Sequence, residues 1–262
     1  MESGNRLIKS LIKKKKEMLL LLFLIIGILN ANSFTVNAMN SHKLIYFDAK
    51  GAAEMIRILL KVGNIEFEDY RFPIKIKEGG GFETPEFDIA KSNGLLVSNM
   101  NRAPVLQLPN GRIVGQSKAI ERYICKLCNF LGENDEESFY IDCCSENIRD
   151  IKDKWGKIRM TGGIGSNKEK EEAIKKFYES ELKEWLEKLE KSLPENQNIN
   201  YAIGSRISYA DIQIWYLMTQ VFEVAEIEKS SENCPKLKLI TNIVSKNENL
   251  QKWLSERPQT MF

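Results

Sequence analysis

The chain has 262 residues, of which 43% are hydrophobic, so it can bury the core of one large domain or two small ones and is not a disordered tail. Its 38 basic and 36 acidic side chains are unevenly spread, because residues 1–38 hold six basic and two acidic ones and leave 32 against 34 in the remainder. This slightly acidic body excludes the electrostatic footprint of a nucleic-acid-binding protein.

The N-terminal segment has the pattern of a secretory signal. Its basic residues precede an apolar run over 18–29 that is shorter than the roughly 20 residues of a membrane-spanning helix, and Val36-Asn37-Ala38 offers a cleavage site. Residues 1–38 are predicted to be a signal peptide, or an uncleaved signal anchor that gives the protein its membrane contact. Either one places the protein in the secretory pathway or outside the cell. Alternatively, translation starts at Met39 and the protein is cytoplasmic.

Residues 42–128 alternate strands and helices. A β-rich run over 43–47 is followed by a helical pattern around 55–60, a strand over 65–72 and a weak helix over 84–92. Strands over 105–108 and 112–114 flank Pro109-Asn110-Gly111, where Asn-Gly supplies the positive φ angles of a tight hairpin. A helix over 117–127 follows. This order predicts a thioredoxin-like α/β domain, with one mixed sheet and helices on its faces.

From residue 133 to the end the pattern is helical, which predicts an all-α domain over 133–262. The clearest helix spans 168–193, with an apolar stripe on one face and Glu-Lys pairs at i,i+4 on the other. Ser208 and Asp211 form a capping box that begins a buried helix over 209–225.

The order and spacing of these motifs over residues 42–262 resemble the glutathione S-transferases. The resemblance is carried by Tyr46-Phe47 at the end of the first strand, Arg102-Ala103-Pro104 before the hairpin, Gln116-Ser117 at a helix start, and Ser208-x-x-Asp211. The Tyr-Phe start and the ending Arg257-Pro-Gln-Thr260 look most like the sigma class, which includes glutathione-dependent prostaglandin D synthases. The resemblance implies a homodimeric detoxification enzyme with glutathione as co-substrate and no metal.

The resemblance also assigns the thiol end of the glutathione site. Tyr46 matches the family's catalytic tyrosine, whose hydroxyl donates a hydrogen bond to the sulfur and so favours the thiolate. Pro104 resembles the cis-proline that presents the backbone of Ala103 to the cysteine of the tripeptide. Alternatively, Tyr46 is an ordinary strand tyrosine and Pro104 a trans turn proline.

Three further positions match binding residues of the family. Gln116 and Ser117 suit the γ-glutamyl carboxylate, because free amides at a helix start favour an anion; alternatively, Ser117 caps its own helix. Arg102 stands where the family often has lysine, or faces solvent. Asp150 aligns with the acidic residue that reaches across the dimer interface toward the amino group of the ligand, and Glu146 and Asp153 lie one turn away on the same helix.

Two departures from the family pattern concern the same site. Sigma-class proteins usually read Arg-Gly-Arg-Ala after the first strand, and the second arginine stabilises the thiolate, whereas this chain has Lys50-Gly51-Ala52-Ala53. The loops at 79–81 and 95–101 look longer than usual, and the sequence does not place the family's Trp and Lys that hold the glycyl end.

The cysteines and His42 are the remaining candidates for redox or metal chemistry, and the sequence favours structural roles for them. The five cysteines show no disulfide framework. Cys125-x-x-Cys128 lies late in a helix, which favours core packing over a redox or metal pair. His42 is the only histidine, so no histidine-based triad or metal cluster is expected.

The resemblance therefore implies an enzyme that conjugates glutathione to a hydrophobic electrophile held between the domains, where Trp155, Met160 and Phe262 are candidate lining residues. Ala52 and the altered loops favour the alternative, a glutathione-binding or scaffold protein with little turnover. A glutathione-dependent isomerase would share the thiolate and differ in the acceptor.

Overall fold

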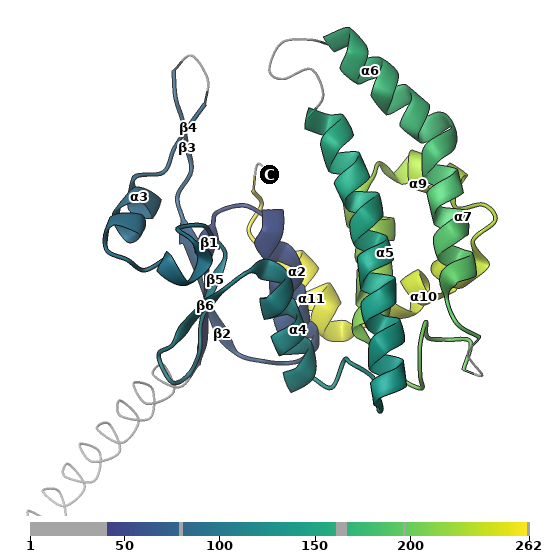
Figure 1. Ribbon diagram of the computed structural model, residues 1–262, viewed down its shortest axis with the longest axis horizontal. Helices are drawn as coiled ribbons and strands as arrows, with labels where there is room; N and C mark the ends of the chain where they lie inside the picture. The colour runs from purple at the N-terminus through teal and green to yellow at the C-terminus, as the bar shows by residue number, and fades with distance from the viewer. Residues whose placement is uncertain (1–40, 79–80, 161–166, 196–197, 261–262) are drawn as a thin grey trace, which may run out of the picture.

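The computed structural model describes residues 41–78, 81–160, 167–195 and 198–260 (Figure 1). The predicted signal segment 1–38, Met39 and Phe262 lie outside the described residues. Within these ranges, no helix is both long and apolar enough to cross a membrane.

A four-stranded mixed sheet organises the first half of the chain. Its strands are β1 (His42–Phe47), β2 (Phe67–Phe72), β5 (Val105–Gln107) and β6 (Ile113–Gly115), in the order β2-β1-β5-β6. β1 pairs parallel with β2 and antiparallel with β5, and β5 pairs antiparallel with β6. Since side chains alternate along a strand, Leu44 and Leu106 face one side and Ile45 and Val105 the other.

Helices cover both faces of this sheet, as predicted for a thioredoxin-like domain. α2 (Glu54–Val62) and α4 (Ser117–Leu127) pack with Leu44 and Leu106, whereas α3 (Pro85–Ser92) covers the face of Ile45 and Val105. Two short 3₁₀ turns, Gly51–Ala53 and Val97–Asn99, precede α2 and β5. A small hairpin of β3 (Lys75–Ile76) and β4 (Phe82–Glu83), which the sequence does not predict, extends the segment between β2 and α3.

The second half forms helices joined by loops, with no strand among its described residues, as expected. The helices are α5 (Asp135–Met160), α6 (Asn167–Lys176), α7 (Leu182–Ser192), α8 (Tyr209–Tyr216), α9 (Val224–Ser230), α10 (Pro235–Ser245) and α11 (Glu248–Glu256). α8 packs against α5 and α10, and α11 returns to lie against α2 of the first half (Figure 1).

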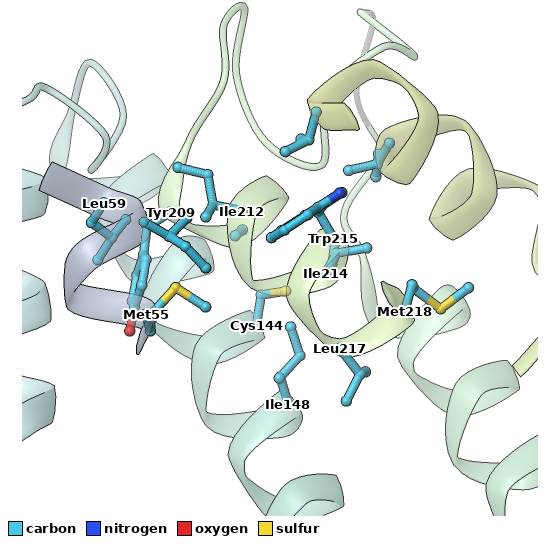
Figure 2. Close-up of a cluster of buried hydrophobic side chains, with 14 of the residues drawn as sticks. Met55, Leu59, Cys144, Ile148, Tyr209, Ile212, Ile214, Trp215, Leu217 and Met218 are labelled. Atoms are coloured by element: carbon cyan, nitrogen blue, oxygen red, sulfur yellow. The ribbon is translucent and has the colours of Figure 1, made fainter. Parts of the chain in front are cut away.

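The two halves share one hydrophobic core. Figure 2 shows Met55 and Leu59 of α2 beside Tyr209 and Ile212 of α8, with Cys144 of α5 next in the cluster. All five side chains are at most 4% exposed. Because α2 is buried between the sheet and the helical half, the positions of the two halves are fixed relative to each other.

Two predicted helices differ from the structure in their continuity. The helix predicted over 168–193 contains a π-helical segment, Phe177–Glu181, between α6 and α7. The helix predicted over 209–225 turns π-helical at Leu217–Val221 and ends before Phe222, which is extended. A π turn adds a residue and shifts the register of the side chains. Phe177 and Phe222 both pack on Trp155, with ring centroids 5.0 and 5.8 Å away.

The β5–β6 hairpin also differs in detail. Gly111 has a φ of 81°, but Asn110 is not in the left-handed region, so the expectation of two positive φ angles was wrong. Leu108 N–H bonds Arg112 O at 2.8 Å and closes a longer loop than a two-residue turn.

Candidate functional site

Tyr46 lies one residue before the end of β1, where the chain turns toward α2. Its phenol oxygen accepts a hydrogen bond of 3.1 Å from the backbone N–H of Ala52. Because that bond uses an oxygen lone pair, the phenol proton stays available for another acceptor. Position 52, which lacks the expected arginine, thus contributes its backbone amide to the phenol.

Gly51 is fitted closely to this phenol. Its φ is +40°, and a Cβ atom built there would lie 2.5 Å from the Tyr46 hydroxyl oxygen. Any other residue would therefore strain the backbone and displace the phenol.

The buried cation behind Tyr46 is Arg57 of α2, which is 0% exposed. Its guanidinium donates to the carbonyl oxygens of Ala49 at 2.7 Å and Phe47 at 3.4 Å, and its Nε bonds both carboxylate oxygens of Asp69 at 3.0 and 3.1 Å. Its Cζ lies 5.9 Å from the centre of the Tyr46 ring. Arg57 therefore fixes the turn that carries Tyr46 and is the cation that the structure places beside the phenol.

A mostly apolar cavity of about 290 Å³ adjoins Tyr46. Its wall continues across the turn and the β3–β4 hairpin, and its lining residues are Tyr46, Phe47, Ala49, Gly51, Ile74, Phe82 and Thr84. The three residues from the β2–α3 segment were not identified from the sequence. Ile74, Phe82 and Thr84 flank the loop at 79–81, where the sequence did not identify the residues that bind the glycyl end of glutathione.

Pro104 is preceded by a cis peptide bond from Ala103, so the trans alternative is excluded. The side chain of Asn99, 4% exposed, holds this turn: its Nδ2 donates to Pro104 O at 2.9 Å, and its Oδ1 accepts from Gln116 N–H at 3.0 Å. Gly115 leaves room for it, since a Cβ there would overlap Asn99. Asn99 thus joins the cis-proline turn to the start of α4.

Gln116 and Ser117 form the N-terminus of α4. Gln116 is the N-cap with a φ of 69°, and no side chain caps the helix, so the alternative that Ser117 caps its own helix is wrong. The first amides of an α-helix have no partner within the helix, and they carry the positive end of its dipole. This helix start is therefore suited to an anion.

Arg102 and Asp150 are both exposed within this chain. The Nε of Arg102 donates only to Asn99 O, at 3.4 Å, so the arginine borders the cis-proline turn without a carboxylate partner among the described residues. Asp150 lies on the exposed surface of α5 beside the Glu146–Arg149 ion pair. The structure groups Tyr46, Ala103, Pro104, Gln116 and Ser117 around the ends of β1, β5 and α4.

The cysteines and His42 take no part in this site. Burial raises the pKa of the Cys125 thiol, and it raises that of Cys128 to about 11, so neither is an activated thiolate. Burial lowers the pKa of His42, whose Nε2 lies 3.4 Å from the Tyr123 hydroxyl. Within the described ranges, no three His, Cys, Asp or Glu side chains are grouped as metal ligands.

Comparison with known proteins identifies the family. Residues 42–126 match the model of the glutathione S-transferase N-terminal domain, and residues 149–257 match a model of the C-terminal domain. A glutathione S-transferase of Plasmodium falciparum is 28% identical over 225 residues, which are 84% of this chain and 97% of the relative.

Solved structures of two transferase classes share the fold. A Fasciola hepatica sigma class transferase is 25% identical with a TM-score of 0.64, and the match covers 86% of this chain and all of that one. An Onchocerca volvulus Pi-class transferase is 28% identical with a TM-score of 0.65, over 83% of this chain and 93% of that one. The α/β domain followed by a helical domain is confirmed. The chain belongs to the glutathione S-transferase family.

Proposed function

We propose that this protein conjugates glutathione to hydrophobic electrophiles and that Tyr46 donates the hydrogen bond that holds the glutathione sulfur as thiolate. The observation that carries the proposal is the hydrogen bond from Ala52 N–H to the phenol oxygen at 3.1 Å, beside the cavity that Tyr46 lines. This bond fixes the phenol while leaving its proton for the sulfur. Family membership supports the same activity.

The rest of the tripeptide is proposed to lie along the turn and the helix start. The backbone of Ala103 pairs with the cysteine, and the amides at Gln116 and Ser117 bind the γ-glutamyl carboxylate. Arg102, exposed beside the turn, supports the carboxylate end. Asp150 is exposed on α5 and is proposed to reach the amino group of glutathione bound to the partner subunit of a homodimer.

Thiol activation requires a modest free energy. Free thiols of this kind have a pKa of about 8.5, and lowering it by about 2 units takes about 2.7 kcal/mol. A phenol hydrogen bond to an anion is worth about 1.5–3 kcal/mol, and the Ala52 amide bonded to the phenol makes it a stronger donor. Arg57, behind the ring, fixes the turn that carries the phenol, but its charge is paired with Asp69 and Glu54 and does not replace the missing arginine at position 52.

The test is the ultraviolet absorbance of thiolate in bound glutathione, titrated against pH for the parent and for Tyr46→Phe. The parent is expected to lower the thiol pKa by about 2 units, and Tyr46→Phe to return it to about 8.5. At pH 6.5 the turnover of 1-chloro-2,4-dinitrobenzene should fall by about 100-fold.

Tyr70→Phe is the matched control, because Tyr70 lies on the neighbouring strand and its hydroxyl bonds Glu86 at 3.1 Å. It should leave the thiol pKa unchanged. If glutathione binds the parent with no shift of the thiol pKa, the transferase proposal fails and the glutathione-binding scaffold replaces it.

Sigma-class membership, the homodimer and export remain proposals as well. The Fasciola hepatica sigma class structure supports the first, and a prostaglandin substrate assay separates the isomerase from the transferase. Light scattering at micromolar concentration tests the dimer. N-terminal sequencing of the mature protein tests whether a signal is removed after Ala38.

A further inference from the structure

Lys152 of α5 is a half-buried cation that contacts an aromatic ring. Its ammonium lies 4.9 Å from the centre of the Tyr216 ring at the end of α8. Among the described residues, no carboxylate lies within 4 Å of it. Its neighbour Lys118 differs, because the Lys118 ammonium bonds both oxygens of the buried Glu121 at 2.9 and 3.1 Å.

Tyr216 links this cation to charged groups near the turn that carries Tyr46. Burial raises the pKa of Tyr216 to about 12, and the charges of Glu54 and Glu121 add to the effect while that of Arg257 opposes it. Tyr46 is close enough to act on the same hydroxyl. The ring that Lys152 contacts therefore lies within electrostatic reach of the thiol-activating phenol.

The helix face beyond Lys152 is open. Gly156 follows Lys152 by four residues and so lies on the same face of α5. Among the described residues, a Cβ at Gly156 would have no atom within 4 Å, and Met160, four residues further, is 81% exposed. A ligand group can therefore approach the ammonium along α5 without displacing any side chain that the structure describes.

No described carboxylate forms an ion pair with the Lys152 ammonium. Burial, and then repulsion from Lys118, lower its pKa to about 8, while Glu121 and Asp153 act weakly in the opposite direction. Tyr216 stays neutral at this pH. A desolvated ammonium lacking an ion pair is costly, and a bound anion removes that cost. At neutral pH most of this side chain is still charged.

We propose that Lys152 binds the carboxylate of an anionic electrophile, so that this transferase favours acceptors with a carboxylate remote from the reacting carbon. The inference rests on the proposed function, since it names the acceptor class of the same site. With 4-chloro-3-nitrobenzoate, the glutathione sulfur forms a bond to the ring carbon bearing chlorine, and chloride leaves with the electron pair of the broken C–Cl bond. The thiol proton goes to solvent, and the carboxylate is unchanged.

The test measures binding rather than turnover, so that it does not depend on catalysis. Calorimetry on the full chain compares two conjugates that differ in one ring substituent: S-(4-carboxy-2-nitrophenyl)glutathione and S-(2,4-dinitrophenyl)glutathione. Lys152→Met is expected to weaken the carboxylate conjugate about 10-fold and to change the dinitro conjugate less than 2-fold. Raising the pH from 7 to 9.5 should weaken the carboxylate conjugate in the parent only.

Lys154→Met is the matched control, because Lys154 lies on the same helix and pairs with Glu181 at 3.2 Å. It should change neither affinity, and a thermal scan of Lys152→Met should show no loss of Tm. Equal effects of Lys152→Met on both conjugates, or no effect on either, would overturn the inference. Turnover of 1-chloro-2,4-dinitrobenzene by the parent tests the proposed function separately, so a failure of one is distinguishable from a failure of the other.

Discussion

The absence of a side chain at Gly51 leaves the space that the Tyr46 phenol occupies. Gly51→Ala would place a Cβ 2.5 Å from the Tyr46 oxygen at a φ of +40°. Because the phenol must move and lose its bond to Ala52, kcat/KM is expected to fall by about 10- to 100-fold, which corresponds to about 1.4–2.7 kcal/mol. Steady-state kinetics with saturating glutathione measures this loss.

Gly111→Ala provides the control for Gly51→Ala. Gly111 has a φ of 81° and no atom near its would-be Cβ, so this variant carries the backbone cost alone. Both variants should lose about 1 kcal/mol of folding stability, measured by urea denaturation. Equal losses of activity in the two variants would show that the contact with Tyr46 is unimportant.

At the same scale, residue types alone located only part of the site. Tyr46, Pro104 and Gln116 stand in motifs with recognisable spacing, and the structure brings these positions together. Asn99 gave no signal, because a loop asparagine looks the same whether it faces solvent or joins two segments. Arg57 falls among the apolar residues of α2, and its contacts with the Phe47–Ala49 turn depend on how the chain folds back.

At the scale of elements, the start of α8 is stabilised mainly by one carboxylate. Asp211 is 0% exposed, and it accepts from the N–H groups of Ser208 and Ala202, each at 2.7 Å. Asp211→Ala would leave both buried donors unpaired, so a loss of about 2–4 kcal/mol is expected. Urea denaturation measures it.

Asn247→Ala is the comparison for Asp211→Ala, because Asn247 caps the peripheral α11 through a single bond of 3.0 Å to Leu250 N–H. It should cost about 1 kcal/mol. If Asp211→Ala costs no more than Asn247→Ala, water satisfies the donors freed near α8 and the buried carboxylate is not needed.

Helix existence followed from the sequence, but helix continuity did not. The 3.6-residue apolar period predicts the helices around 168–193 and from 209, and the capping box at Ser208 and Asp211 is confirmed. The π-helical segments did not show in that period, because one inserted residue shifts the stripe without ending it. The break at Phe222 depends on packing against Trp155, a contact 67 residues distant in sequence that periodicity does not contain.

At the scale of the whole molecule, the C-terminal segment is tied to the turn that carries Tyr46. Periodicity and composition predicted two halves but not this tie, because it joins charges that are 203 residues apart in the sequence. The buried Glu54 accepts from Trp253 Nε1 at 3.2 Å and Arg257 Nη1 at 2.8 Å, and it lies 3.4 Å from Arg57 Nη1. Through Arg57, this carboxylate links α11 and the residue after it to the turn.

Breaking this tie is expected to lower the folding stability and to weaken thiol activation together. Arg257→Ala leaves the Glu54 carboxylate, with a side chain 2% exposed, short of one cation, so about 2–3 kcal/mol of stability should be lost. Adding Glu54→Gln removes the uncompensated charge and should restore about 1 kcal/mol of the folding stability or more. A double-mutant cycle in urea measures this coupling. The thiol pKa of bound glutathione should rise in Arg257→Ala as the turn loosens. Strictly additive losses in the cycle, with an unchanged thiol pKa, would mean that the C-terminal segment merely covers α2 and has no influence on Tyr46.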